Sequence, residues 1–356
     1  MTRQTILQKI EDSGVLKTLR NLKMFLSGLL KATLFHLGFF HLLRVLFPNR
    51  RVAILRYHAV VDPQNCDYAS PGICISKQDF EKHVRYFARR YRVISLDDVI
   101  DTIRAGKPLP TNAVVFTFDD GYADNFLAAE ILKRYNASGT FYLTVSCIDR
   151  AEPFWLFEAN YLILKTKQSH LRLQVNGEQI ELNLADAARK TAAIREVVKI
   201  IKSNNRAVRE TVREQLRQQL AGEEYRDAAD RVMLTWEQVK KMLQNGMIIG
   251  GHTMTHLNLP NADPADAQQE ISMSRVALEK KLEIPIRHFS VPNSGPYRYY
   301  NDQVKQMVAA SGYVSAVTSA HGFVDSKSDL LQLRRIRTVP ELYETIATIE
   351  LIKFRN

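Results

Sequence analysis

Short apolar runs alternate with amphipathic stretches from residue 51 to the C-terminus. The runs at 52–57 and 113–118 are almost continuously apolar, as expected for strands buried on both faces of a sheet. Between such runs, apolar residues recur at helical spacing, as in Phe80, Val84 and Phe87. Strands that alternate with helices predict a parallel α/β sheet or barrel. Further strands are predicted at 92–95, 140–145 and 286–291.

Residues 150–233 interrupt this alternation, and we expect them to form an insertion. Residues 171–184 alternate apolar and polar positions around Asn176-Gly177, which predicts a β-hairpin. Residues 185–231 are charged and helix-prone, so the insertion is predicted to be mainly helical, as a lid or side subdomain. Its arginines are interleaved with acids, which favours a solvated face over a grip on an anionic substrate.

The N-terminal arm, residues 1–50, differs from the rest in composition. Residues 24–47 are rich in Leu and Phe, and up to residue 56 ten basic residues stand against two acidic ones. The uncharged stretch between Lys31 and Arg44 is shorter than the roughly 20 apolar residues that a membrane-spanning helix needs. A basic amphipathic helix at a membrane surface is the favoured interpretation, and docking on the protein's own domain is the alternative. Without its arm, the protein is then expected in the soluble fraction.

The remaining chain, residues 51–356, is predicted to be one domain that carries the insertion. This domain is nearly balanced in charge although the whole chain carries +11, which argues against a nucleic-acid groove. Cys66, Cys74 and Cys147 form no disulfide framework, and free thiols suit a reducing compartment. Together with the arm, they predict a cytoplasmic protein held at the inner face of the membrane. The sequence does not indicate an oligomeric state.

Two adjacent carboxylates, Asp119 and Asp120, follow the most apolar run. Successive residues that leave a strand point in different directions, so one acid can hold a cation while the other handles a proton. Gly121 permits the sharp turn that follows. Asp-Asp-Gly also occurs in ordinary surface turns, so a functional interpretation needs a second motif.

His252 and His256 supply that second motif. They lie four positions apart, after the apolar run 247–249 and a pair of glycines. This spacing can bring both imidazoles to one side of a turn, where they can share a cation. Two histidines and one carboxylate are a known catalytic zinc set that leaves one coordination position for water. Two surface histidines after a glycine pair are the alternative.

Four polar motifs follow apolar strands directly, beginning at His58, Asp119, His252 and Pro292-Asn293. In a parallel α/β barrel the C-terminal ends of the strands share one face, and active sites lie on that face. We therefore expect these residues to gather at one mouth of a barrel.

The segments Thr117–Gly121 and His252–His256 resemble the first two motifs of the polysaccharide deacetylases, the NodB-homology domain of carbohydrate esterase family 4. The segment Leu234–Val239 is similar to that family's approach to its metal histidines. The resemblance covers residue 51 to the C-terminus around the insertion. It implies a distorted (β/α) barrel with a divalent metal, zinc by preference.

The resemblance also implies a role for each motif residue. Asp120, His252 and His256 are expected to hold the metal, and Asp119 to act as general base. The backbone N–H of Asn293 is expected to stabilise the oxyanion.

Further contacts follow from the same resemblance. Phe289–Pro292 is similar to an aromatic-x-x-Pro segment of the family, so Pro292 and Tyr297 are expected to contact the substrate. Asn293 stands where the family often has an aromatic residue, which puts substrate stacking there in doubt. An arginine orients the base in the family, and among the three candidates we expect Arg335 to do so. The other two are Arg334 and Arg337.

His58 is the candidate general acid. The family usually carries this histidine in a Leu-x-x-His-Asp motif near the C-terminus, and residues 345–356 contain no histidine. Circularly permuted members carry an N-terminal Tyr-His instead, which Tyr57-His58 resembles. A structural role for His58 is the alternative.

The predicted function is metal-dependent removal of N-acyl groups, chiefly N-acetyl, from amino sugars of a polysaccharide or lipid-linked saccharide. The arm favours a lipid-linked sugar or nascent exopolysaccharide near a membrane. A catalytically impaired carbohydrate-binding member of the same fold is the alternative. A glycosidase is disfavoured because adjacent carboxylates cannot easily flank a bond from opposite sides. A two-metal phosphoesterase usually needs more ligands.

Overall fold

A computed structural model describes residues 14–149, 153–293 and 299–354. Its contacts divide the chain into two units, one of residues 50–340 and one of residues 1–49 together with 341–356. The C-terminal residues therefore group with the N-terminal arm and not with the domain predicted for 51–356.

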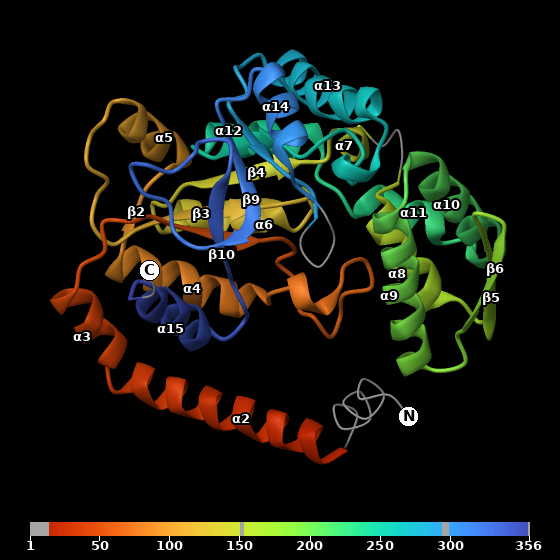
Figure 1. The fold of residues 1–356 in the computed structure, drawn as a ribbon, viewed down its shortest axis with the longest axis horizontal. Helices are drawn as coiled ribbons and strands as arrows, with labels where there is room; N and C mark the ends of the chain where they lie inside the picture. Colours follow the sequence, from red (N-terminus) through yellow and green to blue (C-terminus); the bar gives the residue numbers. More distant parts are fainter. Residues whose placement is uncertain (1–13, 150–152, 294–298, 355–356) are drawn as a thin grey trace, which may run out of the picture. The chain divides into compact units, whose positions relative to one another are not determined.

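The unit of residues 50–340 is built from alternating strands and helices (Figure 1). Its strands are β1 (Ala53–Tyr57), β2 (Arg92–Val93), β3 (Ala113–Phe118), β4 (Gly139–Leu143), β5 (His170–Val175), β6 (Glu178–Asn183), β7 (Ile248–Gly251), β8 (His288–Ser290), β9 (Ser315–His321) and β10 (Leu333–Arg337). Its α-helices are α4 (Lys77–Arg90), α5 (Leu96–Arg104), α6 (Asn125–Arg134), α7 (Val145–Ile148), α8 (Trp155–Lys165), α9 (Ala187–Ser203), α10 (Arg206–Leu220), α11 (Tyr225–Arg231), α12 (Trp236–Gln244), α13 (Pro264–Leu282) and α14 (Asp302–Ala310). Two short 3-10 helices are η1 (Pro71–Ile73) and η2 (Leu259–Asn261).

Within the described part of this unit, seven parallel strands close into a barrel. Their order is β1, β3, β4, β7, β8, β9 and β10, and β10 pairs again with β1. The short strand β2 adds a further parallel pairing to β3. The α/β class and the barrel predicted from the sequence are confirmed.

Side chains of the barrel interior change from apolar to polar along the strands. Residues two apart on a strand share a face, so Ile54 and Arg56 on β1 form one inward column, and Leu333 and Arg335 on β10 form another. Ile54 and Leu333 belong to the buried apolar core. The N-terminal half of the barrel is thus filled, and the C-terminal mouth is left for polar groups.

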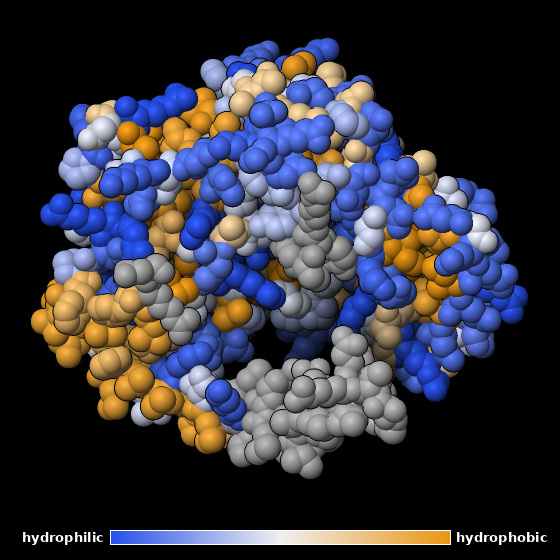
Figure 2. Space-filling model, viewed as in Figure 1, coloured by the Kyte–Doolittle hydropathy of each residue, from blue (hydrophilic) through white to orange (hydrophobic). Residues whose placement is uncertain are grey.

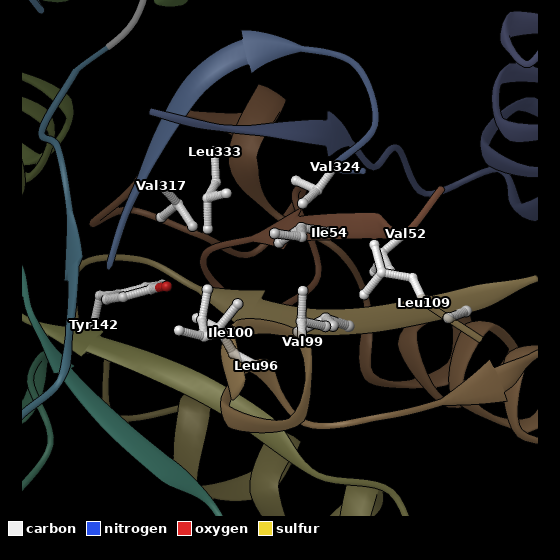
Figure 3. Packing of buried hydrophobic residues seen from close by; sticks show 12 residues of the cluster. Val52, Ile54, Leu96, Val99, Ile100, Leu109, Tyr142, Val317, Val324 and Leu333 are labelled. Atoms are coloured by element: carbon white, nitrogen blue, oxygen red, sulfur yellow. The ribbon is translucent and has the colours of Figure 1, made fainter. Parts of the chain in front are cut away.

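Helix α5 packs on the apolar half of the barrel. Its start is fixed by a capping box in which Ser95 and Asp98 bond each other's backbone N–H. Leu96, Val99 and Ile100 then face Ile54 and the neighbouring strands (Figure 3). Burial of each such side chain contributes about 1.5–3 kcal/mol to folding, which makes this end a rigid base.

The insertion contains α8, β5, β6, α9, α10 and α11, so its mainly helical character is confirmed. Strands β5 and β6 pair antiparallel across Asn176-Gly177, as predicted. The solvated face expected for the arginines is wrong for Arg209 and Arg213, which are each 2% exposed. Arg213 pairs instead with the fully buried Glu158 of α8, because a buried charge needs a partner.

The second unit joins the arm to the C-terminal helix. Its helices are α2 (Gly14–His36), α3 (Phe39–Leu46) and α15 (Leu342–Ile352). Lys31 Nζ lies 2.7 Å from Glu344 Oε2, and Lys353 Nζ donates to the carbonyl oxygens of Leu43 and Phe47 at 3.0 and 2.9 Å. These contacts hold the ends of the chain together.

The arm leaves a row of large apolar side chains exposed. Figure 2 shows them as an orange patch over α3 and the adjoining part of α2. Those more than half exposed are Phe25, Leu26, Leu29, Leu30, Leu37, Leu42, Val45, Leu46 and Phe47. No single described helix is long and apolar enough to cross a membrane, whereas 25–36 and α3 together pass that test with a 67° bend between them.

Candidate active site

The barrel mouth collects the residues that the sequence placed after strand ends. His58 follows β1, Asp119 and Asp120 follow β3, and His252 follows β7. Together with Asn293 they line a cavity of about 210 Å³. The gathering expected at one mouth of the barrel is therefore present.

Asp120, His252 and His256 converge on one point. Their ligand atoms all lie within 4.8 Å of one another, and all three side chains are buried. The Nε2 atoms of His252 and His256 lie 3.3 and 3.4 Å from Asp120 Oδ1. Burial lowers the pKa of His256 to about 3, so its imidazole is neutral at pH 7, the form that binds a metal.

The orientation of His252 is fixed by a backbone carbonyl. Its Nδ1 lies 2.7 Å from the carbonyl oxygen of Ser290, so Nδ1 carries the proton and Nε2 offers its lone pair to the centre. Such a contact behind the ring is typical of metal-binding histidines. The donor set thus fits a divalent cation, and two imidazoles with one carboxylate suit zinc.

The backbone around this centre is unusually strained. Asp120, Thr253, His256 and Asn293 all have positive φ angles, of 79°, 64°, 58° and 74°. Residues other than glycine seldom adopt this region, and such strain persists where the surrounding structure holds the site in place. Four cases at one mouth support the identification of a functional site.

Gly251 allows the close packing that brings His252 into the barrel mouth. A Cβ atom at this position would lie 2.2 Å from the Tyr313 hydroxyl. The glycine pair before the histidines is therefore required by packing between β7 and its neighbours, since any side chain would push the strand away.

Asp119 is held by two side chains, those of Arg335 and Ser290. Arg335 donates to both of its oxygens, at 2.8 and 2.7 Å, and Ser290 Oγ donates to Oδ1 at 2.9 Å. Burial raises the pKa of Asp119, but the charge of Arg335 outweighs this effect, so the pKa lies below its ordinary value. Asp119 is therefore an ionised acceptor, and Arg335 is the arginine that contacts it.

His58 lies beside Asp119 in the same cavity. Its Nε2 is 3.7 Å from Asp119 Oδ2. Burial lowers the pKa of His58 to about 4 despite the nearby Asp120 and Asp119, so the imidazole is neutral at pH 7. His58 is close enough to exchange a proton with Asp119 once a substrate or water tightens the contact.

The segment after β8 bears the remaining predicted residues. Asn293 lines the cavity, and its backbone N–H has no acceptor within the described ranges. Pro292 is buried and does not line the cavity, and its substrate contact stays a prediction. Tyr297 lies outside the described residues.

The insertion directly supports the loop that carries His252 and His256. Arg209 of α10 donates to the carbonyl oxygen and to Oγ1 of Thr255, at 3.1 and 2.9 Å. Thr255 donates through N and Oγ1 to the buried Glu270 of α13, at 2.8 and 2.6 Å. Trp155 Nε1 donates to the carbonyl oxygen of His256 at 3.2 Å. Residues far apart in the sequence therefore fix the loop between the two histidines.

Several of these contacts are absent from the sequence-based predictions. Ser290, Arg209 and Glu270 carry no signal of their own, because a serine near a strand end and charges on helices are common. The insertion also lines the cavity through Leu156, Val198 and Lys202. Only the folded chain brings them to the site.

A closed parallel barrel whose mouth holds a buried Asp-His-His cluster and a second, arginine-bound aspartate places the chain among the α/β barrel proteins with a candidate metal site. The family described as polysaccharide deacetylase matches residues 106–316, more than half of the chain. The chain belongs to the polysaccharide deacetylase family.

Individual relatives are distant. YxkH of Bacillus subtilis (strain 168), provisionally named a polysaccharide deacetylase, is 30% identical over 107 residues. This match spans 30% of the present chain and 37% of that protein.

Solved structures share the fold. The Streptococcus pyogenes deacetylase PplD in complex with acetate has a TM-score of 0.55 at 20% identity, over 84% of this chain and 97% of that one. IcaB from Ammonifex degensii has a TM-score of 0.53 at 16% identity, covering 85% and 97%. BC0361, a polysaccharide deacetylase from Bacillus cereus, has a TM-score of 0.51 at 17% identity, covering 84% and 70%.

Proposed function

We propose that this protein is a metal-dependent hydrolase that removes N-acetyl groups from amino sugars of a polysaccharide or lipid-linked saccharide. The observation that carries the proposal is the convergence of Asp120, His252 and His256 beside the arginine-bound Asp119 at one cavity. Membership of the polysaccharide deacetylase family supports the reaction type. Acetate, held by the S. pyogenes neighbour, is the product that this reaction would release.

Asp120, His252 and His256 would hold the cation, zinc by preference. A divalent cation at this point supplies Lewis-acid chemistry to a water molecule and to the substrate carbonyl. The neutral imidazole of His256 and the ionised carboxylate of Asp120 match this task, because ligands must be deprotonated to bind a metal.

Asp119 would accept the proton of the attacking water as a C–O bond forms at the acetyl carbon. The two hydrogen bonds from Arg335 fix the direction of its carboxylate. The backbone N–H of Asn293 would donate to the oxyanion that develops on the carbonyl oxygen.

His58 would pass that proton to the amine as the C–N bond breaks. Because His58 is neutral at rest, it must first gain the proton, and Asp119 Oδ2 at 3.7 Å is the nearest source. The released products are a free amino sugar and acetate, so the proton taken from water ends on the amine. The permuted origin of Tyr57-His58 stays a prediction.

The exposed apolar face of the arm would bind a membrane surface. Phe25, Leu29 and Leu42 are each more than half exposed, and the arm is rich in basic residues. Such a helix lies in the interface of a bilayer and is attracted by anionic lipids. We place the protein at the cytoplasmic face, near a lipid-linked or nascent glycan.

Acetate release tests the proposal. Purified protein is incubated with N-acetylated oligosaccharides and lipid-linked N-acetyl sugars, and products are screened by mass spectrometry for replacement of acetyl by hydrogen. We expect this change with zinc-loaded protein and its loss after chelation. Protein that binds zinc and glycan without releasing acetate would favour the carbohydrate-binding alternative.

His58→Ala tests the acid. We expect kcat to fall about 10²–10⁴-fold, the usual contribution of a general acid, with zinc affinity unchanged. The loss should shrink for substrates whose leaving amine is less basic, because these need less protonation. An unchanged rate would return His58 to a structural role.

A further inference from the structure

We propose that the cavity holds an anion subsite, formed by Arg56 and Arg337, which binds a phosphate or carboxylate group carried by the glycan substrate. This inference rests on the proposed function and specifies its substrate class. Nothing in the deacetylation chemistry itself requires these two arginines.

The two arginines lie side by side on neighbouring strands. Arg56 on β1 and Arg337 on β10 are register partners in the parallel sheet. Paired residues of adjacent strands project to the same face, and both side chains line the cavity that contains the metal-binding cluster. A ligand with its amide at the cluster can therefore reach them from the same cavity.

Neither arginine has an ion-pair partner among the described residues. Arg335, which lies two residues before Arg337 on the same face of β10, forms an ion pair with Asp119. Across the residues that the structure describes, no carboxylate forms an ion pair with Arg56 or Arg337. The only acceptor that Arg337 bonds among them is the carbonyl oxygen of Gly72, at 2.9 Å.

Of the two arginines, Arg56 gives the stronger evidence for a bound anion. Its Nε atom is buried and meets no acceptor among the described residues. Buried N–H groups are nearly always hydrogen-bonded, so such a donor beside a cavity indicates a ligand acceptor. Burial and the charge of Arg335 lower the pKa of Arg56 to about 10, and the charge of Asp119 offsets this effect only in part.

The chemistry of the pair selects the ligand. Guanidinium groups present several N–H donors in a plane, which match the oxygens of a phosphate or carboxylate in bidentate contacts. Lys202 of the insertion adds a further basic side chain to the cavity wall. Asp119 and Asp120 are the acidic members of the described lining, and both are committed to the reaction centre. A neutral glycan would leave the two arginines uncompensated.

Equilibrium binding to the zinc-loaded full-length protein tests the subsite without requiring turnover. Three N-acetylated probes are compared. Methyl N-acetyl-α-glucosaminide is neutral, N-acetylglucosamine 1-phosphate carries a phosphate, and N-acetylmuramic acid carries a carboxylate. We expect calorimetry to show at least one anionic probe binding about tenfold or more tighter than the neutral one, the effect of a charge-assisted contact. The stronger anionic probe identifies phosphate or carboxylate as the natural group.

Variants separate the arginines from the metal as the source of this preference. Arg56→Gln and the more exposed Arg337→Gln should each reduce the preference about tenfold, and high salt should weaken it. Arg334→Gln, a neighbour on β10 that does not line the cavity, should retain it.

Two outcomes overturn the inference. One is equal affinity for all three probes, and the other is a preference that survives in both cavity variants, which would place the anion on the metal. Acetate release in the separate assay would still support the proposed function in either case. If the intact protein prefers an anionic probe but releases no acetate in that assay, the proposed function would be refuted and the anion subsite would stand.

Discussion

Asp119 and Asp120 are neighbours in the chain but have opposite surroundings in the fold. Asp119 faces Arg335 and Ser290, whereas Asp120 faces the Nε2 atoms of His252 and His256. The φ angle of 79° at Asp120 turns the second carboxylate away from the first. The division of labour proposed for the two acids follows from this turn, because each carboxylate meets a different set of partners.

Asp119→Asn should separate metal binding from turnover. The variant keeps the shape of the side chain but loses the proton acceptor, so we expect kcat to fall about 10²–10⁴-fold with zinc still bound. His252→Ala should lose both zinc and activity, because it removes a ligand. Acetate release and metal analysis of the same samples check the pair, and near wild-type rates in Asp119→Asn would disprove the assignment of the base.

His83 should make folding stability depend on pH. It lies buried between Tyr57 Oη at 3.0 Å and the carbonyl oxygen of Pro340 at 3.2 Å, and burial lowers its pKa from 6.5 to about 4. Between these values the unfolded chain binds a proton that the folded chain does not. The free energy of unfolding should therefore fall as pH decreases through this window, by up to about 1.4 kcal/mol per pH unit.

Urea unfolding of the chelated protein between pH 7 and pH 4.5 measures this slope. His83→Gln should reduce it, while the exposed His170→Gln should leave it unchanged. Equal slopes in all three proteins would show that His83 is not the source of the pH dependence.

The insertion acts on the active site through identifiable contacts. Helix α10 supplies Arg209 to Thr255, and the start of α8 supplies Trp155 to the backbone of His256. Helix α9 places Lys202 and Val198 in the cavity wall. The insertion, which interrupts the alternation of strands and helices in the sequence, therefore completes the cavity wall and supports the histidine loop.

Arg209→Gln should weaken zinc binding although Arg209 is no ligand. Loss of its two hydrogen bonds frees the strained loop that positions His256, and changes behind metal ligands typically cost 10–100-fold in affinity. Competition with a chromophoric chelator measures the affinity. Arg209→Lys should restore part of it, and the exposed Arg189→Gln on α9 is the matched control.

A fall in melting temperature without a change in zinc affinity would contradict this prediction. Arg209 would then stabilise only the insertion, and Glu270 and Trp155 would hold the loop between the histidines without it.

At the scale of the whole molecule, the chain combines a barrel unit with a helical unit made from both ends of the sequence. The helical unit has its own hydrogen bonds, from Lys31 to Glu344 and from Lys353 to Leu43. It also displays large apolar side chains that no described residue covers. In the described part of the barrel unit, by contrast, the exposed large apolar side chains are Met273 and Val276 of α13.

Replacement of Leu29, Leu30 and Leu42 by Gln should abolish membrane binding. The three are 57%, 59% and 53% exposed, so the changes remove apolar surface without emptying a core. Intact protein should sediment with anionic phospholipid vesicles, and the triple variant should stay in the supernatant.

Met273→Gln with Val276→Gln, exposed positions on α13, provides the matched control and should behave as the intact protein does. Intact protein that stays in the supernatant would disprove the membrane proposal. Sedimentation without vesicles would indicate self-association through the same face.

Local pattern predicted β1, β3, β4, β7 and β8 of the barrel and the residues that gather at its mouth, whereas β9 and β10 were not predicted. The capping box at Thr235 and Gln238 and the hairpin at Asn176-Gly177 are contacts between near neighbours, so the sequence predicts them directly. The burial of Arg209 and Arg213 was not predicted, because an amphipathic helix has the same charge pattern whether its polar face meets solvent or buried partners. The grouping of α15 with the arm was not predicted from the sequence either, because it depends on contacts between segments far apart in the chain.

The order of the residues alone determined that apolar strands would end in carboxylates and imidazoles, because alternation, turn residues and motif spacing are local properties. Only the closed barrel decided three further features. These are the arginine that bonds Asp119, the arginine without an ion-pair partner beside the cavity, and the contacts that support the loop between the histidines. Closure of the barrel brings β1 and β3 beside β10, although both lie far from β10 in the sequence. Burial then determines which charges must pair. Those pairings depend on distance in space, which no local pattern records.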